Sequence, residues 1–176
     1  MNIMLGRWAP WYSRGHRQSY GPTNTYYVAQ EWLAGLSVED WGCGYARFKE
    51  FHKGPYKGVD GTAGWADHIA DLTTYRSDVE GILLRHVLDH NHEWRPILRN
   101  ALESFSKRLV LVLFTPDSGI RNGEKVIAHV DALGVDDLAL PHWEIDNVFL
   151  LRHTVEKTHL PTATGYSGET VWLVEK

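Results

Sequence analysis

The sequence predicts an α/β protein with a doubly wound, mostly parallel sheet, helices on both of its faces and an antiparallel hairpin at the C-terminus. Short apolar segments alternate with segments of helical periodicity over residues 24–116. The apolar runs within residues 79–88 and 107–116 show no polar alternation, which is typical of strands buried on both faces. After residue 150, two strand-like segments are joined only by a loop, so they should pair antiparallel.

The first half of the predicted fold is a helix followed by a β-α-β unit. Apolar residues recur at helical spacing through "NTYYVAQEWLAGL", with Thr25 as a candidate cap and Gly35 as the end. The next segments favour a short strand, a helix and a second strand beyond the Gly54-Pro55 turn. Their sequences are "SVEDW", "ARFKEFHK" and "YKGVD".

The second half continues the alternation and then changes character. The patterns predict a short strand, a buried strand, an amphipathic helix with Pro96 in or near its first turn, and a fully apolar strand stopped by Pro116. These segments are "DHIADL", "VEGILLRHVL", "EWRPILRNALESF" and "KRLVLVLFTP". Residues 117–141 favour a loop with short helix. The tail predicts two antiparallel strands, "RHTVEKTHL" and "ETVWLVEK", joined by a loop.

Length and composition predict one domain over residues 1–176, long enough to bury a core without disulfides. Tryptophan and tyrosine each occur eight times, and several cluster near the N-terminus. Residues 1–23 are therefore a candidate lid over a ligand, which Tyr12, Tyr20 and Tyr27 would line. A place in the core is the commoner role of such aromatic residues.

Charge and cysteine content exclude several classes. The net charge is −4, and no run of Lys or Arg would follow a phosphate backbone, so a nucleic-acid partner is not favoured. One cysteine forms no internal disulfide, and no segment predicts a membrane span or a secretory signal. The expectation is a cytoplasmic protein with no membrane partner, and no feature indicates an oligomeric state.

The stretch "VEDWGCGYARF" places two glycines directly after the first predicted strand. Gly42 and Gly44 let the backbone turn tightly and approach a ligand, because no Cβ is in the way. A helix starting near Ala46 would direct amide donors at that ligand. Asp60 ends the second strand, where a carboxylate can accept both hydroxyls of a ribose. Alternatively, the glycines serve only a tight turn, without any ligand.

Two cofactor classes use this geometry. A dinucleotide site requires GxGxxG, and in this register Arg47 stands at the third glycine, which weakens a nicotinamide-dependent oxidoreductase. The same stretch resembles the signature of class I S-adenosylmethionine-dependent methyltransferases, an acidic residue followed by GxGxG. Asp40, Gly42 and Gly44 match it, whereas Ala46 replaces the last glycine.

The resemblance extends from about residue 24 to the end, includes the C-terminal hairpin, and implies a Rossmann-like fold with S-adenosyl-L-methionine as cofactor. "YKGVDGT" is similar to the family's second motif, which puts Asp60 on the ribose. "HIADLTT" resembles the third, which implies Asp71 and the Leu72 amide beside the adenine. The cofactor-binding residues implied in this way are Asp40, Gly42, Cys43, Gly44, Asp60, Gly61, Asp71, Leu72 and His86.

The class of methyl acceptor is inferred from which acceptor-specific motifs of the family this sequence resembles and which it lacks. The run "LLRHVLDHNHEW" resembles one found in small-molecule and glycan-associated methyltransferases. The DNA amino-methyltransferase motif, Asn or Asp before Pro-Pro-aromatic, and the Pro-Cys nucleophile of cytosine-ring enzymes are missing. The expected reaction transfers a methyl group to an oxygen or nitrogen atom of a small-molecule or glycan-like acceptor. The alternatives are the nicotinamide-dependent enzyme and a catalytically inactive cofactor binder.

Three histidines follow the fourth predicted strand: His86, His90 and His92. A zinc site is not favoured, because neither HExxH nor a cysteine pair is present. The catalytic candidates are His86, His90 and Asp89. In one interpretation His86 takes the acceptor proton, with Asp89 or His90 as a polar partner. In the other, His86 shapes the cofactor pocket and no dedicated base exists. Cys43 is expected to serve steric fit.

Overall fold

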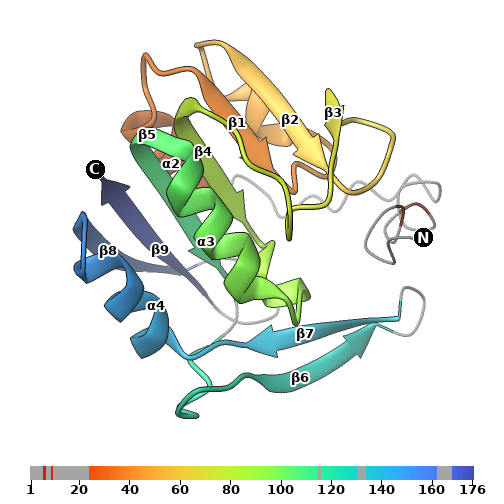
Figure 1. The fold of residues 1–176 in the computed structure, drawn as a ribbon, viewed down its shortest axis with the longest axis vertical. Coiled ribbons are helices and arrows are strands. Elements are labelled where there is room, and N and C mark those ends of the chain that lie inside the picture. Colours follow the sequence, from red (N-terminus) through yellow and green to blue (C-terminus); the bar gives the residue numbers. More distant parts are fainter. Residues whose placement is uncertain (1–5, 7–8, 10–23, 115, 131–133, 162–167) are drawn as a thin grey trace.

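The computed structural model describes residues 6, 9, 24–114, 116–130, 134–161 and 168–176, and its centre is a seven-stranded sheet (Figure 1). The strand order is β3-β2-β1-β4-β5-β9-β8. β1 to β5 are parallel, while β9 runs antiparallel to both β5 and β8. The strands are β1 Val38–Trp41, β2 Tyr56–Asp60, β3 His68–Ile69, β4 Val79–Arg85, β5 Phe105–Leu113, β8 Thr154–Pro161 and β9 Gly168–Glu175. The predicted mostly parallel sheet with a C-terminal antiparallel hairpin is confirmed.

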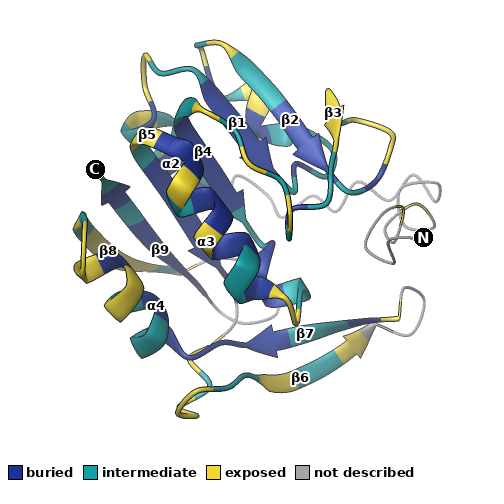
Figure 2. Cartoon of the chain, viewed as in Figure 1, coloured by how far each residue is buried: buried dark blue, intermediate teal, exposed yellow. Residues whose placement is uncertain are grey.

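Helices cover both faces of the sheet. One face packs against α3 (Trp94–Ser104) and α4 (His142–Leu150), and the other packs against α2 (Asn24–Trp32). Alternate residues of β5 divide between these two cores, and the central strands are buried on both sides (Figure 2). Leu109, Leu111 and Leu113 face α3, whereas Val110 and Val112 face α2.

The predicted helix after β1 is wrong. Residues 47–50 form only a turn of 3-10 helix, η1. Ala46 precedes it with φ 52, a left-handed conformation that cannot begin an α-helix. The chain must also return from the end of β1 to the start of β2 within residues 42–55, and the glycine turn and Gly54-Pro55 occupy part of that length. The expectation of helical amide donors near Ala46 is therefore corrected.

The predicted cap of α2 is also wrong. Thr25 lies inside the helix, which begins at Asn24, and the Thr25 hydroxyl donates a hydrogen bond to Oε2 of Glu169 at 2.8 Å. Gly35 follows the helix with φ 77, as expected of a residue that terminates one.

Residues 117–141 hold a hairpin where a loop with short helix was predicted. β6 (Lys125–Val130) and β7 (Val135–Ala139) pair antiparallel as a separate sheet. Val135 and Leu138 are buried, so one side of the hairpin rests on the protein. The hairpin lies against η2 (Leu88–His90), a short 3-10 helix after β4. Apolar and polar residues do not alternate regularly along either strand, so they give no clear period-2 signal, and β7 packs against η2.

Most of the proposed lid, residues 1–23, lies outside the described residues, as do Tyr12 and Tyr20. Gly6 is described, and its amide donates to the carbonyl of Gly61 at 2.7 Å. Tyr27 is about half exposed, and its ring contacts Phe51 edge-on. None of the described helices has the length and apolar character needed to cross a membrane.

Candidate functional site

The carboxyl ends of the parallel strands meet at one edge of the sheet. At β1 the strand order reverses, because β2 pairs with one side of β1 and β4 pairs with the other. β1 ends at Trp41, β2 at Asp60 and β4 at Arg85. Because β9 is antiparallel, its first residues reach the same edge, and Thr170 pairs with Leu113 at the end of β5. Open α/β sheets bind ligands in the crevice at such a switch point.

The glycine turn is fastened to the neighbouring strand. The amides of Gly42 and Cys43 donate to the Val59 carbonyl at 2.7 and 3.2 Å, and both Gly42 (φ 72) and Gly44 (φ 53) are left-handed. A Cβ on Gly42 would collide with Cγ2 of Val87. The fold alone therefore requires glycine at position 42, as the tight-turn interpretation expects.

Asp60 joins the end of β2 to this turn. Its Oδ2 accepts the Gly44 amide at 3.0 Å and its Oδ1 accepts the Thr62 amide at 2.8 Å. The side chain is almost fully buried. These two hydrogen bonds fix the orientation of the carboxylate at the carboxyl end of β2.

Asp40 lies in the interior behind the turn. Oδ2 of Asp40 accepts the Tyr56 hydroxyl at 2.9 Å. Burial raises the pKa of this carboxyl to about 7, although the Tyr56 bond and the positive charge of Arg85 oppose the rise. Asp40 is therefore a buried acid whose charge changes near neutral pH, because little solvent reaches its ionised form.

Cys43 packs against the strand beneath the turn. A Cβ on Gly58 would approach Sγ of Cys43 to 2.9 Å, so the thiol fills the space that Gly58 leaves. Burial and the neighbouring carboxylates raise the pKa of the thiol far above its ordinary value. A thiol that stays protonated is a poor nucleophile, which favours the steric role.

Gly61, Asp71 and Leu72 lie beside the end of β2, because β3 pairs with it. The Ala70 amide donates to the Asp60 carbonyl at 2.9 Å. Oδ1 of Asp71 accepts the amide and the hydroxyl of Thr73, which closes a local turn. The structure thus brings three of the predicted cofactor residues next to Asp60.

His86 follows β4 in a left-handed conformation (φ 55), which is uncommon for a residue with a side chain and points to a constrained position. Its Nε2 contacts Oε1 of Glu169, and its Nδ1 lies 3.5 Å from Oδ2 of Asp89. Both ring nitrogens therefore face buried carboxylates. Such an arrangement fixes the ring and favours the interpretation in which His86 shapes the pocket.

Glu169 was not predicted, and it is the centre of this buried cluster. Its Oε1 also pairs with Nη2 of Arg85 at 2.6 Å, and the Arg85 guanidinium stacks over the Tyr26 ring. Burial alone would raise the pKa of the Glu169 carboxyl, but the His86 bond and the charge of Arg85 hold it below its ordinary value. The sequence signals for this cluster were two charged residues next to apolar runs: Arg85 at the end of β4 and Glu169 near the start of β9.

His90 and His86 both pack against the ring of Phe114. The ring centroids of these histidines are 5.2 and 4.4 Å from that of Phe114. Nδ1 of His90 lies 2.9 Å from Oδ1 of Asp137 in β7, and this carboxylate was not predicted either. Burial lowers the pKa of His90, but Asp137 and Asp89 outweigh it and raise the pKa above its ordinary value.

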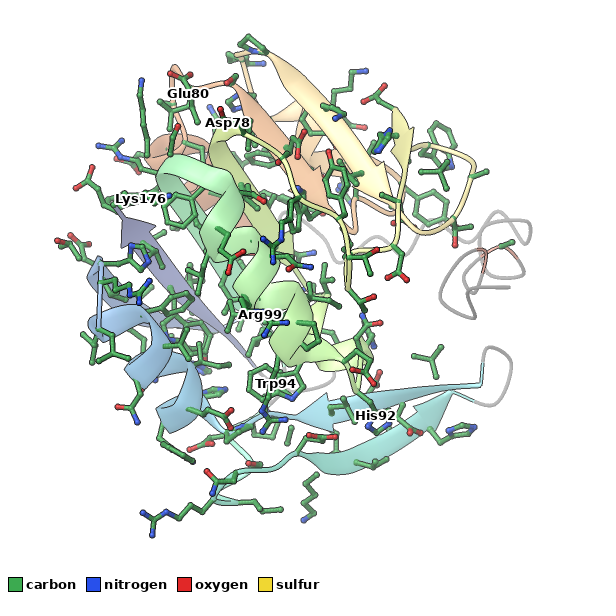
Figure 3. The ribbon with its side chains drawn as sticks, in the orientation of Figure 1. Asp78, Glu80, His92, Trp94, Arg99 and Lys176 are labelled. Atoms are coloured by element: carbon green, nitrogen blue, oxygen red, sulfur yellow. The ribbon has the colours of Figure 1, made fainter. Side chains whose placement is uncertain are left out.

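His92 projects over the hairpin, next to Trp94 (Figure 3). Its Nδ1 and Nε2 contact Glu124 at 3.1 Å and Asp136 at 2.9 Å, and its side chain is about half exposed. Although acids and histidines gather here, no group of three or more metal-ligating side chains in the described part of the chain is arranged to hold a metal ion.

No protein-family model matches the sequence, and no curated protein matches it either. Solved structures do resemble it. The chain is similar to 1,6-didemethyltoxoflavin-N1-methyltransferase from Burkholderia thailandensis, solved with 1,6-didemethyltoxoflavin and S-adenosylhomocysteine. The identity is 15%, the TM-score is 0.65, and the match covers 96% of this chain and 86% of that chain.

Two further structures give the same result. For magnesium protoporphyrin IX methyltransferase from Synechocystis PCC 6803, the identity is 16% and the TM-score 0.59, over 93% of this chain and 84% of that one. For an S-adenosylmethionine-dependent methyltransferase from Mesorhizobium loti, the identity is 12% and the TM-score 0.59, and the match covers 86% of this chain and 96% of that one. The chain has the class I S-adenosylmethionine-dependent methyltransferase fold. Within this methyltransferase fold, Ala46 adopts the left-handed conformation at the position where the signature has its last glycine.

Proposed function

We propose that this protein is an S-adenosylmethionine-dependent methyltransferase that transfers a methyl group to an oxygen or nitrogen atom of a small-molecule or glycan-like acceptor. The observation that carries the proposal is the hydrogen bond between the Gly44 amide and Asp60. It holds an oriented carboxylate and a glycine turn together at the switch point of a methyltransferase fold. A turn required only for packing would not need a buried carboxylate at the carboxyl end of the neighbouring strand, where open α/β sheets bind their ligands.

The residues around this bond fit the proposed cofactor. Asp60 would accept the ribose hydroxyls, Asp71 and Leu72 would border the adenine, and the turn at residues 42–44 would lie along the methionine part. The proposed site also includes three flanking residues: Asp40 in β1, Gly61 directly after β2 and His86 directly after β4. When bound, S-adenosylmethionine supplies a methyl group that its sulfonium makes electrophilic. The protein's part is to hold the acceptor in line and to exclude water.

The proposed class of methyl acceptor is supported by the structurally similar enzymes and by the net charge of this chain. Two of the structurally similar enzymes are named for the molecules 1,6-didemethyltoxoflavin and magnesium protoporphyrin IX. The net charge of −4 gives this chain no general attraction for nucleic acid. A small acceptor is therefore the better match.

Two alternatives make different predictions. A nicotinamide-dependent oxidoreductase is disfavoured because β9 is reversed, whereas the doubly wound dinucleotide fold continues with parallel strands, and because Arg47 stands at the third glycine position. An inactive binder would keep the cofactor site and lack turnover. Calorimetry with S-adenosylhomocysteine and NAD separates the first alternative, since tight binding of NAD alone would overturn the proposal.

Asp60→Ala tests the site itself. We expect S-adenosylhomocysteine to bind more weakly by about 1.5–3 kcal/mol, because the variant loses hydrogen bonds to a charged group. Asp78→Ala is the matched control, since Asp78 is exposed before β4 at the far end of the sheet from His92 (Figure 3). Unchanged affinity in Asp60→Ala would show that Asp60 does not hold the ribose.

Turnover is tested with labelled S-adenosylmethionine and the small-molecule fraction of a cell extract. Transfer of the label to an extractable product supports the enzyme. Binding of S-adenosylhomocysteine without any transfer favours the inactive binder.

A further inference from the structure

The connection between β3 and β4 is fastened to α3. Residues 70–78 form this connection without a helix or a strand, and they run beside α3 (Figure 1). Nδ2 of Asn100 donates to the Leu72 carbonyl at 3.0 Å, and the Ser77 amide donates to Oγ of Ser104 at 3.0 Å. Asn100 and Ser104 lie about one helical turn apart, and each is only 2% exposed. Two buried side chains of α3 therefore hold the connection in place.

Both peptide units that contain Leu72 are held by hydrogen bonds. In the first unit, the Asp71 carbonyl accepts the amides of Thr74 at 3.0 Å and Tyr75 at 2.8 Å. A trans peptide directs its C=O and N–H groups to opposite sides, so the Leu72 amide points away from these two bonds. In the second unit, the Leu72 carbonyl accepts the Asn100 side chain. These bonds together fix the direction of the Leu72 N–H group.

The Leu72 amide is a donor that the fold does not use. Leu72 is 8% exposed, and its amide has no hydrogen-bond partner within the part of the chain that the structure describes. The amides of residues 73–75 differ, because all three donate to Asp71. Most buried backbone N–H groups in proteins are paired. An oriented but unused donor beside the end of β2 therefore points to a ligand atom that accepts a hydrogen bond.

The groups around this amide suit one class of purine. The carboxylate of Asp71 is an acceptor next to the donor of Leu72, and the Thr73 amide and hydroxyl orient its Oδ1. Adenine presents the complementary pair on one edge, with the acceptor N1 beside the 6-amino donor. Hypoxanthine presents the reverse, because its N1 carries a proton and its O6 is an acceptor. A fixed donor therefore rejects the 6-oxopurine, since donor would face donor.

We propose that Asn100 is a positioning residue for the cofactor, and that it makes the site selective for a 6-aminopurine by fixing the Leu72 amide. Asn100 acts through the Leu72 carbonyl, so α3 controls the adenine end of the site from behind the connection. This inference rests on the proposed function, in which Asp71 and Leu72 border the adenine. It goes further because it says which buried side chain makes that edge selective.

Ser104 provides a matched control for Asn100. Both side chains are buried in α3, and each makes one hydrogen bond to the backbone of the same connection. The Ser104 bond is at Ser77, two residues before β4, whereas the Asn100 bond is at Leu72. A purely structural role of Asn100 predicts that loss of either bond has the same kind of effect. A positioning role predicts that only the Asn100 bond affects the choice of purine.

Selectivity is measured by calorimetry with S-adenosylhomocysteine and its 6-oxo analogue, S-inosylhomocysteine. We expect wild type to prefer S-adenosylhomocysteine. Asn100→Leu keeps the size of the side chain and removes the donor, so S-adenosylhomocysteine should bind about 3–10-fold more weakly while the analogue changes little. The preference should fall by the same factor. Ser104→Ala should keep the preference of wild type, although denaturant unfolding should show that both variants are less stable.

NMR of protein with ¹⁵N-labelled leucine gives a measurement that needs no substitution. We expect the Leu72 amide resonance to shift, and its exchange with water to slow, when S-adenosylhomocysteine binds to wild type. A Leu72 amide that does not respond to the bound ligand would overturn the inference, even if Asn100→Leu failed to fold. An unchanged preference in Asn100→Leu, or an equal loss of preference in Ser104→Ala, would also overturn it. Failure of wild type to bind S-adenosylhomocysteine would instead contradict the proposed function.

Discussion

The residues in and beside the glycine turn are constrained for different reasons, some by backbone conformation and packing and some by the proposed ligand. Gly42 is required by its left-handed backbone and by contact with Val87, so its substitution would damage packing before it reports on a ligand. Ala46 is left-handed without being glycine, which stores strain in the same turn. Asp60 is different, because its carboxylate orients the turn and lies at the carboxyl end of β2, where open α/β sheets bind ligands. The residue type in a motif therefore does not say whether the fold or the ligand requires it.

Asp40 predicts a pH dependence of stability. Its pKa is raised from 3.8 to about 7 in the folded protein. Below pH 4, the carboxyl is protonated in both states and adds nothing. Between pH 4 and 7, the unfolded chain ionises while the folded one keeps the proton, so the free energy of unfolding falls as the pH rises. Above pH 7 the loss is complete.

We expect Asp40→Asn to remove this dependence, because the amide has the same shape and no charge. Relative to this variant, wild type should lose up to about 4 kcal/mol between pH 4 and 8, from a shift of about three pH units. Denaturant unfolding at several pH values measures the difference. A difference between the two proteins that does not change with pH would contradict the assigned protonation of Asp40.

At the scale of elements, one buried cluster joins parts of the chain that are distant in sequence. Glu169 at the start of β9 contacts Arg85 at the end of β4 and Thr25 in α2, and His86 is held by the same carboxylate. The cluster thus fastens the reversed strand to the centre of the sheet. The hairpin makes a second link of this kind, since Asp137 meets His90 in η2.

Glu169→Leu should destabilise the fold by about 3–5 kcal/mol, because it removes the carboxylate that pairs with buried Arg85. Adding Arg85→Met should recover most of this loss, since the uncompensated charge is then gone. Denaturant unfolding measures both variants. Glu156→Ala on exposed β8 is the control and should change stability by less than about 0.5 kcal/mol. A loss below about 1 kcal/mol for Glu169→Leu would mean that the cluster is not important for stability.

At the scale of the whole molecule, stability is distributed unevenly. β4 and β5 pair on both sides within the sheet and are covered by helices on both faces. Within the described part of the chain, β6 and β7 pair only with each other, and several of their residues are exposed (Figure 2). The molecule therefore combines a rigid centre with a less protected hairpin that carries Asp137.

Hydrogen exchange followed by mass spectrometry should resolve this difference. We expect the amides of β4 and β5 to exchange last, through global unfolding, and those of β6 and β7 to exchange earlier, through local opening. Equal protection of the hairpin and the central strands would show that the hairpin unfolds only with the core. In that case Asp137 would be held as rigidly as the sheet.

The succession of the sheet strands, the helices α2 and α3, the glycine turn, the acids at the strand ends and the terminal hairpin followed from the sequence, because each depends on a local pattern of apolar residues or turn residues. No helix was predicted over residues 142–150, where α4 lies. The η1 turn after β1 and the β6–β7 hairpin also did not follow from the sequence. A left-handed Ala46 and the contact with η2 determine them, and neither leaves a periodic signal. The surroundings of the histidines were decided by tertiary structure alone. Insertion of β9 between β5 and β8 brings Glu169 to His86, and the hairpin brings Asp137 to His90. Protonation depends on charges that are close in space and far apart in the chain, so the sequence identified the candidate histidines and only the fold shows which carboxylates surround each of them.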